Sequence, residues 1–267
     1  MIARIAFYTW VGMTLVYLAA PVVVVIISSF SSGAVLTFPP SSFSTQWYFN
    51  ISPSYYDALW VSLIVAAVSS ALATLVGVPA GISLARGRYP GKTLISTICL
   101  MPLTVPSLVI GVALFQYFFI LYDYFGWSLG GTLQGLILAH LILTIPFVIR
   151  SVISSYVLYD ETLDEAARSL GASPLRTVFL VTLPVLRPAI ISGAAFAFVM
   201  SFDDVPVALF VGGGAATTLP IKIFTAIEFD LGGHVMAISS IIVVASLVAA
   251  IILERLVGID RLMGFKK

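Results

Sequence analysis

The sequence contains few charged residues. Asp, Glu, Lys and Arg make up 9% of its 267 residues, whereas 60% are hydrophobic and the mean hydropathy is +1.10. A soluble domain usually carries about 25% charged residues, so this composition excludes the soluble class. It predicts an all-α integral membrane protein surrounded by membrane lipid. The net charge of +1 gives no indication of a nucleic-acid partner.

Residues that could carry covalent or metal chemistry are also scarce. The single cysteine, Cys99, excludes a disulfide framework and a cysteine metal cluster. No second metal-binding residue stands at ligand spacing from His140, so we interpret it as packed or hydrogen-bonded. The segment 87–93 resembles a phosphate-binding loop but has Arg86 where the first glycine is required. With no Gly-x-Ser-x-Gly pattern either, we predict no catalytic residue, metal or cofactor in this chain.

Six apolar runs are long enough to cross a hydrocarbon core of about 30 Å. A helix is expected for each, because a helix satisfies its own backbone hydrogen bonds. We place the spans near residues 8–29, 58–85, 93–119, 132–156, 188–211 and 234–256, within one transmembrane domain over residues 1–267. The first run is longer than the apolar part of a signal peptide, and Ala19-Ala20-Pro21 is a poor cleavage site.

Lys and Arg gather in alternate loops, which predicts the side that faces the cytoplasm. Loops 30–57 and 120–131 contain neither residue, and the last loop on that side has only Lys222. Both termini and the loop 157–187 are therefore expected in the cytoplasm. The other twelve basic residues all lie on that side: Arg4, Arg86, Arg88, Lys92, Arg150, Arg168, Arg176, Arg187, Arg255, Arg261, Lys266 and Lys267.

The loop 157–187 is predicted to contain two short helices. Residues 162–165 form the pattern of a capping box, which would begin the first helix, and Gly171 is a natural stop. Between these limits, small or apolar residues recur at helical spacing and form one flat face: Leu163, Ala166, Ala167 and Leu170. An alternative interpretation is an ordinary amphipathic helix lying on the lipid surface.

A second helix-start signal follows Gly171. Ser173 is expected to cap a second helix with Pro174 at its first position. Pro184 and Pro188 are expected to bend the chain before the fifth span. The two helices would therefore meet at a tight turn on the cytoplasmic side.

Two adjacent acids, Asp203 and Asp204, stand inside the predicted fifth span. Each costs about 2.5–3.5 kcal/mol in a membrane, so such residues normally face a bundle interior or water. Counted at 1.5 Å per residue, the pair lies roughly 22 Å from the cytoplasmic end of the span. Adjacent residues point about 100° apart on a helix, so the two acids are expected to have different roles.

The acids have two possible interpretations. As a cation-attracting site on a transport path, they would act with aromatic and sulfur-containing neighbours, namely Phe196, Met200 and Phe202. Phe196 and Met200 share one helix face with Asp203. Alternatively, either acid could form a hydrogen bond or ion pair with another span or a partner subunit.

Residues 165–188 resemble the cytoplasmic loop of ABC importer permeases, whose pattern is E-A-A-x3-G-x9-I-x-L-P. Val181 stands in place of the isoleucine. This resemblance implies a type I ABC importer permease fold of six transmembrane helices, with a coupling helix in the cytoplasm. By the same resemblance, the residues that contact the ATPase are Glu165, Ala166, Ala167, Arg168, Gly171 and Pro184.

The family resemblance also implies partners and a location. A second permease subunit, homologous to this one and forming a heterodimer with it, would complete the transport path. Two ATPase subunits would carry Mg-ATP, and a periplasmic binding protein would deliver the solute. The chain would then be a multi-pass protein of a bacterial inner membrane with no catalytic role of its own.

Three segments, 202–205, 210–213 and 219–223, resemble spermidine/putrescine-type permeases. The resemblance implies a polyamine substrate. Ferric-iron, aminophosphonate and opine-type permeases share much of the pattern, and Pro206 stands where members often have an aliphatic residue. Two other classes remain open: a cation-coupled secondary carrier or channel, and an intramembrane enzyme. The carrier does not account for the loop pattern, and the enzyme lacks a nucleophile with a base.

We predict that a reporter fused after Lys267 is cytoplasmic, because the basic residues identify that side. A reporter inserted near Ser44 should be external. Labelling of intact cells with a membrane-impermeant reagent checks both positions. Opposite labelling at either position would contradict the six-span arrangement.

Overall fold

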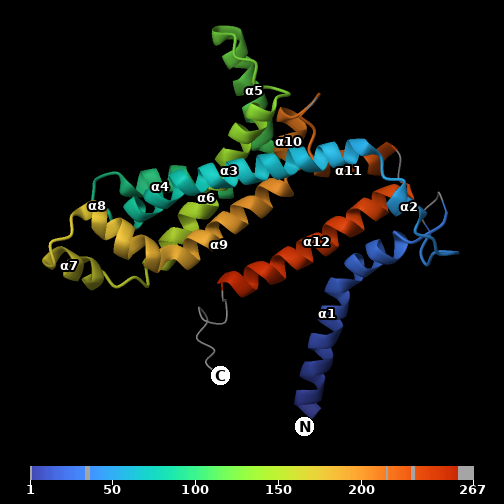
Figure 1. Ribbon diagram of the computed structural model, residues 1–267, viewed down its shortest axis with the longest axis horizontal. Coiled ribbons are helices and arrows are strands. Elements are labelled where there is room, and N and C mark those ends of the chain that lie inside the picture. Colours follow the sequence, from blue (N-terminus) through green and yellow to red (C-terminus); the bar gives the residue numbers. More distant parts are fainter. Residues whose placement is uncertain (1, 34–36, 215, 230–231, 258–267) are drawn as a thin grey trace. The chain divides into compact units, whose positions relative to one another are not determined.

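The computed structural model describes residues 2–33, 37–214, 216–229 and 232–257, and these residues are almost entirely helical (Figure 1). Three of the basic residues predicted to be cytoplasmic lie outside the described residues: Arg261, Lys266 and Lys267. The helices are α1 (Ile2–Ser28), α2 (Gln46–Phe49), α3 (Pro53–Arg86), α4 (Lys92–Leu100), α5 (Ser107–Phe125), α6 (Leu133–Tyr156), α7 (Thr162–Ser169), α8 (Pro174–Thr177), α9 (Leu183–Phe202), α10 (Pro206–Val211), α11 (Leu219–Phe229) and α12 (Gly233–Val257).

Six helical segments of the described chain are long and apolar enough to cross a membrane, as predicted. They are Arg4–Ser28, Pro53–Arg86, Ser107–Phe125, Leu133–Tyr156, Pro174–Phe202 and Gly233–Ile252. The first, second, fourth and sixth agree with the predicted spans to within a few residues at most ends.

The predicted third span, 93–119, is wrong as a single helix. α4 ends in a short 3-10 turn, Met101–Leu103, and α5 begins only at Ser107. Pro106 has φ −55° and ψ 131° in the N-cap position of α5. A proline has no N–H to continue a helix and disfavours helical geometry in the residue before it, so the chain breaks here. The observed span lies further along the chain, over 107–125.

The predicted fifth span, 188–211, is also wrong in its limits. α8 continues through a π-helical turn, Val178–Thr182, directly into α9, so this helical run begins earlier than expected. Pro184 and Pro188 therefore lie within the run and do not precede it. In the wider π turn, the Leu183 N–H donates to the Val178 carbonyl five residues earlier, and the turn joins α8 to α9 in one helical run.

The described residues form two compact units, one made of residues 1–57 and 222–256 and the other mainly of residues 58–221. In the first unit, α2 is tied to both long helices. Tyr48 Oη lies 2.5 Å from Ser29 Oγ and 2.7 Å from Ser240 Oγ of α12. Trp47 Nε1 donates to the Ser31 carbonyl at 2.8 Å. These bonds satisfy polar atoms that lie beside long apolar helices.

The second unit is built around close packing of α3 on α6. A Cβ added to Gly77 would lie 2.9 Å from Val148 Cβ, and one added to Gly81 would lie 2.8 Å from Val152 Cβ. The Gly-x-x-x-Gly spacing therefore allows these helices to approach closely, as small residues do in membranes. Leu186 and Ala197 of α9 are buried in the same cluster.

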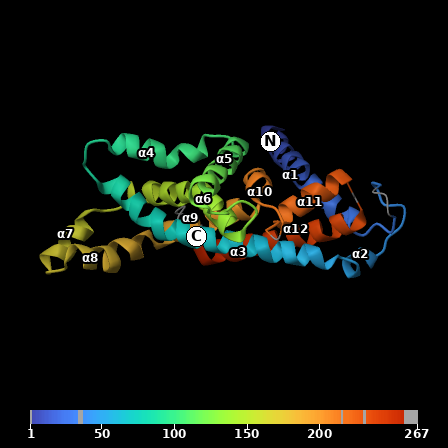
Figure 2. The same ribbon diagram turned by 90° about the horizontal axis from the view of Figure 1, so that it is seen from above.

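One end of the second unit holds the short helices α7 and α8. α7 and α8 lie near the C-terminal end of α3 in both views (Figures 1 and 2). α10 packs instead against α5, where a Cβ on Gly111 would lie 3.0 Å from the Pro206 carbonyl oxygen. The long helix α9 connects these two regions of the unit.

Gly81→Val should destabilise the protein, because the new side chain overlaps Val152. Overpacking of this kind commonly costs about 1–3 kcal/mol, so the melting temperature in detergent should fall by several degrees. Gly12→Val is the matched control, since a Cβ at Gly12 meets no atom within 4 Å. An equal effect of both variants would contradict the proposed close contact.

Candidate functional site

The first loop helix, α7, begins one residue earlier than predicted, with Glu161 and not Thr162 in the N-cap position. The expected capping box at 162–165 is wrong, because Glu161 occupies the N-cap position and its side chain makes no capping bond. Asp160 Oδ1 instead accepts the Thr162 backbone N–H at 3.0 Å and the Thr162 hydroxyl at 2.7 Å. These two hydrogen bonds hold the pKa of Asp160 below its ordinary value.

The end of α7 follows the prediction. Gly171 has φ +87°, a left-handed conformation that glycine adopts without strain. The N–H of Gly171 donates to Arg168 O at 2.9 Å, and that of Ala172 donates to Ala167 O at 3.1 Å. This pair of bonds is a Schellman motif, which satisfies carbonyls at the end of a helix.

The second loop helix also begins as predicted. Ser173 Oγ accepts the backbone N–H of Arg176 at 3.4 Å, and Pro174 is in the first turn of α8. The two helices therefore meet at a short glycine-containing turn. Pro184, predicted as part of the same surface, lies exposed in the first turn of α9.

The flat face of α7 points away from the rest of the chain. Leu163 is 42% exposed, Leu170 is 90% exposed, and Ala166 is also exposed. Ala167 is half-buried. Glu165 and Arg168, which lie off this face, are exposed as well. A small apolar surface held out by two capped helices is suited to contact with another protein.

Another side of α7, about 100° round the helix from Leu163, holds a buried acid whose role the sequence analysis did not identify. Asp164 is 2% exposed, and its Oδ1 accepts the Tyr159 hydroxyl at 2.6 Å and the Thr182 hydroxyl at 3.1 Å. Its Oδ2 lies 3.0 Å from Arg86 Nη1 at the end of α3. Burial, with the Asp164 hydrogen bond second, raises the pKa of Tyr159 to about 12. Three separate segments therefore meet at one carboxylate.

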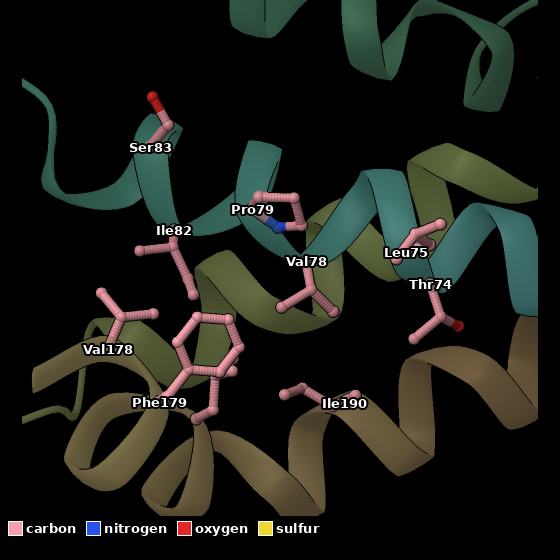
Figure 3. A pocket seen from close by; sticks show the side chains of 10 residues that line it. Thr74, Leu75, Val78, Pro79, Ile82, Ser83, Val178, Phe179 and Ile190 are labelled. Atoms are coloured by element: carbon pink, nitrogen blue, oxygen red, sulfur yellow. The ribbon is translucent and has the colours of Figure 1, made fainter. Parts of the chain in front are cut away.

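An apolar pocket lies beside this cluster, between α3 and the start of α9 (Figure 3). Its volume is about 590 Å³. It is lined by one face of α3, by the π-helical turn and by the first half of α9: Thr74, Leu75, Val78, Pro79, Ile82, Ser83, Val178, Phe179, Leu183 and Ile190. The side chains of α3, the π-helical turn and α9 therefore do not fill the space between these elements.

The acid pair does not lie inside a helix, which corrects the prediction. α9 ends at Phe202 and α10 begins at Pro206, so both acids lie at or within the break between them. The helical hydrogen bonding is interrupted here because Pro206 has no backbone N–H to donate, although Asp203 and Val205 keep right-handed backbone angles. Asp203 is exposed, whereas Asp204 is 9% exposed.

Asp204 is held by the protein itself. Its Oδ2 accepts the backbone N–H of Ala208 at 3.0 Å, which satisfies a free donor in the first turn of α10. The same oxygen lies 3.9 Å from His140 Nε2. His140 is fully buried and its Nδ1 lies 2.8 Å from Ser201 Oγ, as expected for a hydrogen-bonded histidine. Ser201 Oγ in turn lies 3.0 Å from Ser69 Oγ of α3.

The remaining predicted path residues lie on different parts of α9. Phe196 is 62% exposed and Met200 is 45% exposed, and both share a face with Asp203, as the helical spacing predicts. Phe202 is half-buried and stacks on Phe198, with ring centroids 6.1 Å apart. Asp203, Phe196 and Met200 thus form an open surface, whereas Asp204 belongs to the interior.

The described residues contain no group of three or more His, Cys, Asp or Glu side chains that could hold a metal ion. What they contain is an exposed acid on an apolar helix face and, at the other end of the same helix, a protruding pair of capped helices.

Comparison with known proteins is consistent with this architecture. A family described as "Binding-protein-dependent transport system inner membrane component" matches residues 77–259. The putrescine transport system permease protein PotI of Escherichia coli (strain K12) is 33% identical over 234 residues, covering 86% of this chain and 82% of the relative. The spermidine/putrescine transport system permease protein PotC of the same strain is 32% identical over 251 residues, covering 93% and 92%.

The fold is also similar to that of a solved membrane transporter. The crystal structure is that of a bacterial ABC transporter involved in the import of the acidic polysaccharide alginate. One of its chains superimposes with a TM-score of 0.72 over 95% of this chain and 96% of that chain, at 14% identity. At this identity the likeness concerns the fold alone.

Proposed function

The chain belongs to the family of binding-protein-dependent transport system inner membrane components, and from this premise we propose that it imports a polyamine-like organic cation. Membership makes it a multi-pass permease component of an importer rather than an intramembrane enzyme or a secondary carrier. It is a transport component, and we propose that ATP is hydrolysed on separate ATPase subunits.

The proposed substrate class is supported by the names of the relatives and by the chemistry of α9. PotI and PotC are named for putrescine and for spermidine with putrescine. A cation that crosses a low-dielectric passage requires negative charge or aromatic faces along it. Asp203 supplies an exposed carboxylate, and Phe196 lies on the same face of α9. The observation that carries the proposal is that Asp203 is exposed, whereas its neighbour Asp204 is buried and bonded to the Ala208 N–H.

The two acids therefore have different proposed roles. Asp203 is the residue that attracts the cation, because nothing in its described surroundings covers it and it shares a face with Phe196 and Met200. Asp204 holds the beginning of α10 through Ala208 and lies beside His140. Its proposed role is to stabilise the helix break that presents Asp203.

We also propose the assembly and orientation that follow from family membership. α7 would dock on an ATPase through its exposed face and through Glu165, Ala166, Ala167, Arg168 and Gly171, with Pro184 nearby. A second, homologous permease, two ATPases with Mg-ATP and an external binding protein would complete the importer. Both termini and the segment containing α7 and α8 would be cytoplasmic, because twelve of the thirteen Lys and Arg residues lie on that side.

Asp203→Asn should lower putrescine uptake by about tenfold in proteoliposomes that contain the complete complex. Removal of one carboxylate–cation contact worth about 1.4 kcal/mol gives a factor of this size. Asp203→Glu should retain most of the uptake. Asp123→Asn, which removes an exposed carboxylate near the end of α5, is the matched control and should leave uptake unchanged.

Asp204→Asn should act differently and mainly reduce the amount of assembled complex, because it weakens the start of α10. The affinity of the binding protein for putrescine should stay the same in both variants, since first recognition occurs outside this chain. Normal uptake by Asp203→Asn would contradict the proposal. So would ATPase activity that responds only to an anionic or neutral solute.

Ala167→Asp should reduce co-purification of the ATPase at least fivefold, because it places a charge on the flat face of α7. Insertion of the permease into the membrane should be unaffected. Ser169→Asp adds the same charge to the same helix away from that face and should co-purify normally. If Ala167→Asp co-purifies and transports like the wild type, α7 does not dock through this face.

A further inference from the structure

We propose that Asp164 is the positioning residue that carries a movement of α7 into the membrane helices. The inference rests on the proposed role of α7 as the ATPase contact and names the connection on its inner side. Asp164 joins α7 to the end of α3 through Arg86 and to the π-helical turn before α9 through Thr182. Its third partner is Tyr159, in the segment between α6 and α7.

Asp164 is placed to act as a connector because the rest of α7 faces outward. Of the eight residues of α7, all of them described, Asp164 alone is buried. Six of the other side chains of α7 are exposed, and Ala167 is half-buried. A push or pull on the outer face therefore reaches the interior of the second unit through this carboxylate and through the two ends of the short helix.

The geometry of the cluster favours a rigid connection. Hydrogen bonds depend on direction, whereas apolar contacts do not, and Asp164 accepts two of them beside its ion pair with Arg86. Three partners bind the carboxylate, at 2.6, 3.1 and 3.0 Å, and they come from three different segments. At 3% side-chain exposure, water competes weakly for these partners, so the charge of Asp164 acts at a low effective dielectric.

The link through Thr182 leads to the acid break. Thr182 ends the π-helical turn, and α9 continues from Leu183 to Phe202 without interruption. A helix of 20 residues is about 30 Å long, and α9 stays helical over this length although Pro188 removes one of its backbone hydrogen bonds. A displacement of Thr182 is therefore expected to move Met200 and Asp203 at the far end of α9.

The apolar pocket leaves room for such a displacement. Close-packed interiors resist movement of one element past another. Here the space of about 590 Å³ lies between α3 and the residues Val178, Phe179 and Leu183 (Figure 3). Asp164 contacts Arg86, in the helix that forms one side of this gap, and Thr182, in the turn that forms the other, so it can set their separation when α7 moves.

The test compares the Asp164→Asn complex with the wild type in proteoliposomes supplied with binding protein, putrescine and ATP. Asn keeps the shape of the side chain and removes its charge. The expected result is a complex that keeps its ATPase subunits and hydrolyses ATP but imports at least fivefold less putrescine per ATP. Arg86→Lys should retain more of this ratio than Arg86→Gln. Glu161→Gln, an exposed carboxylate in the N-cap position of α7, should leave the ratio unchanged.

A second measurement does not depend on the substrate. Met200→Cys in a Cys99→Ser background places a thiol for maleimide labelling at the far end of α9. In the wild-type background, trapping with ATP and vanadate should change the labelling rate. With Asp164→Asn added, the nucleotide should still be trapped but the change in labelling should be lost.

These readings separate this inference from the proposed function. Loss of ATPase binding in Ala167→Asp tests docking, and putrescine uptake by the wild type tests the substrate. The Asp164 inference is overturned if Asp164→Asn keeps the wild-type import per ATP, or if import and hydrolysis fall in proportion. If Asp164→Asn does not assemble, Tyr159→Phe and Thr182→Val are measured. Each should lower the ratio about twofold, and wild-type ratios in both would overturn the inference.

Discussion

A backbone N–H or C=O group in a hydrocarbon layer must find its hydrogen-bond partner within the protein, and this constraint shapes three breaks between the described helices. The break before α5 uses Pro106, which has no N–H to satisfy. The start of α10 uses the Asp204 carboxylate, which accepts Ala208 N–H. The start of α11 uses a buried hydroxyl, since Ser62 Oγ accepts the Leu219 N–H at 2.8 Å.

The same constraint explains why two adjacent acids differ. Once Asp204 turns inward to satisfy α10, the chain geometry at the break leaves Asp203 on the exposed face of α9. His140, Ser201 and Ser69 extend the polar interior from α6 across α9 to α3. Asp204 thus stabilises the break, and the break leaves Asp203 exposed. A single carboxylate in a continuous helix could not fill both positions.

Features set by neighbouring residues could be predicted from the sequence, and features set by distant contacts could not. The apolar spans, the left-handed Gly171 and the Ser173 cap each follow from a few consecutive residues. The breaks at 104–106 and 203–205 were missed because a hydropathy window averages over a single proline. The role of Asp164 could not be predicted, because its partners Arg86 and Thr182 belong to other segments of the chain and no local pattern identifies them.

The two sides of α7 also differ in the type of contact that each can make. Its outer face is small and apolar, and such a surface gives affinity without a strict direction, which suits a partner that changes shape. Its inner side makes one ion pair and two hydrogen bonds, and the hydrogen bonds hold only over a narrow range of distance and angle. If the inner contacts were apolar as well, α7 could slide over α3 and the π-helical turn when it was displaced. The buried carboxylate prevents this sliding, so a displacement of α7 becomes a displacement of α9.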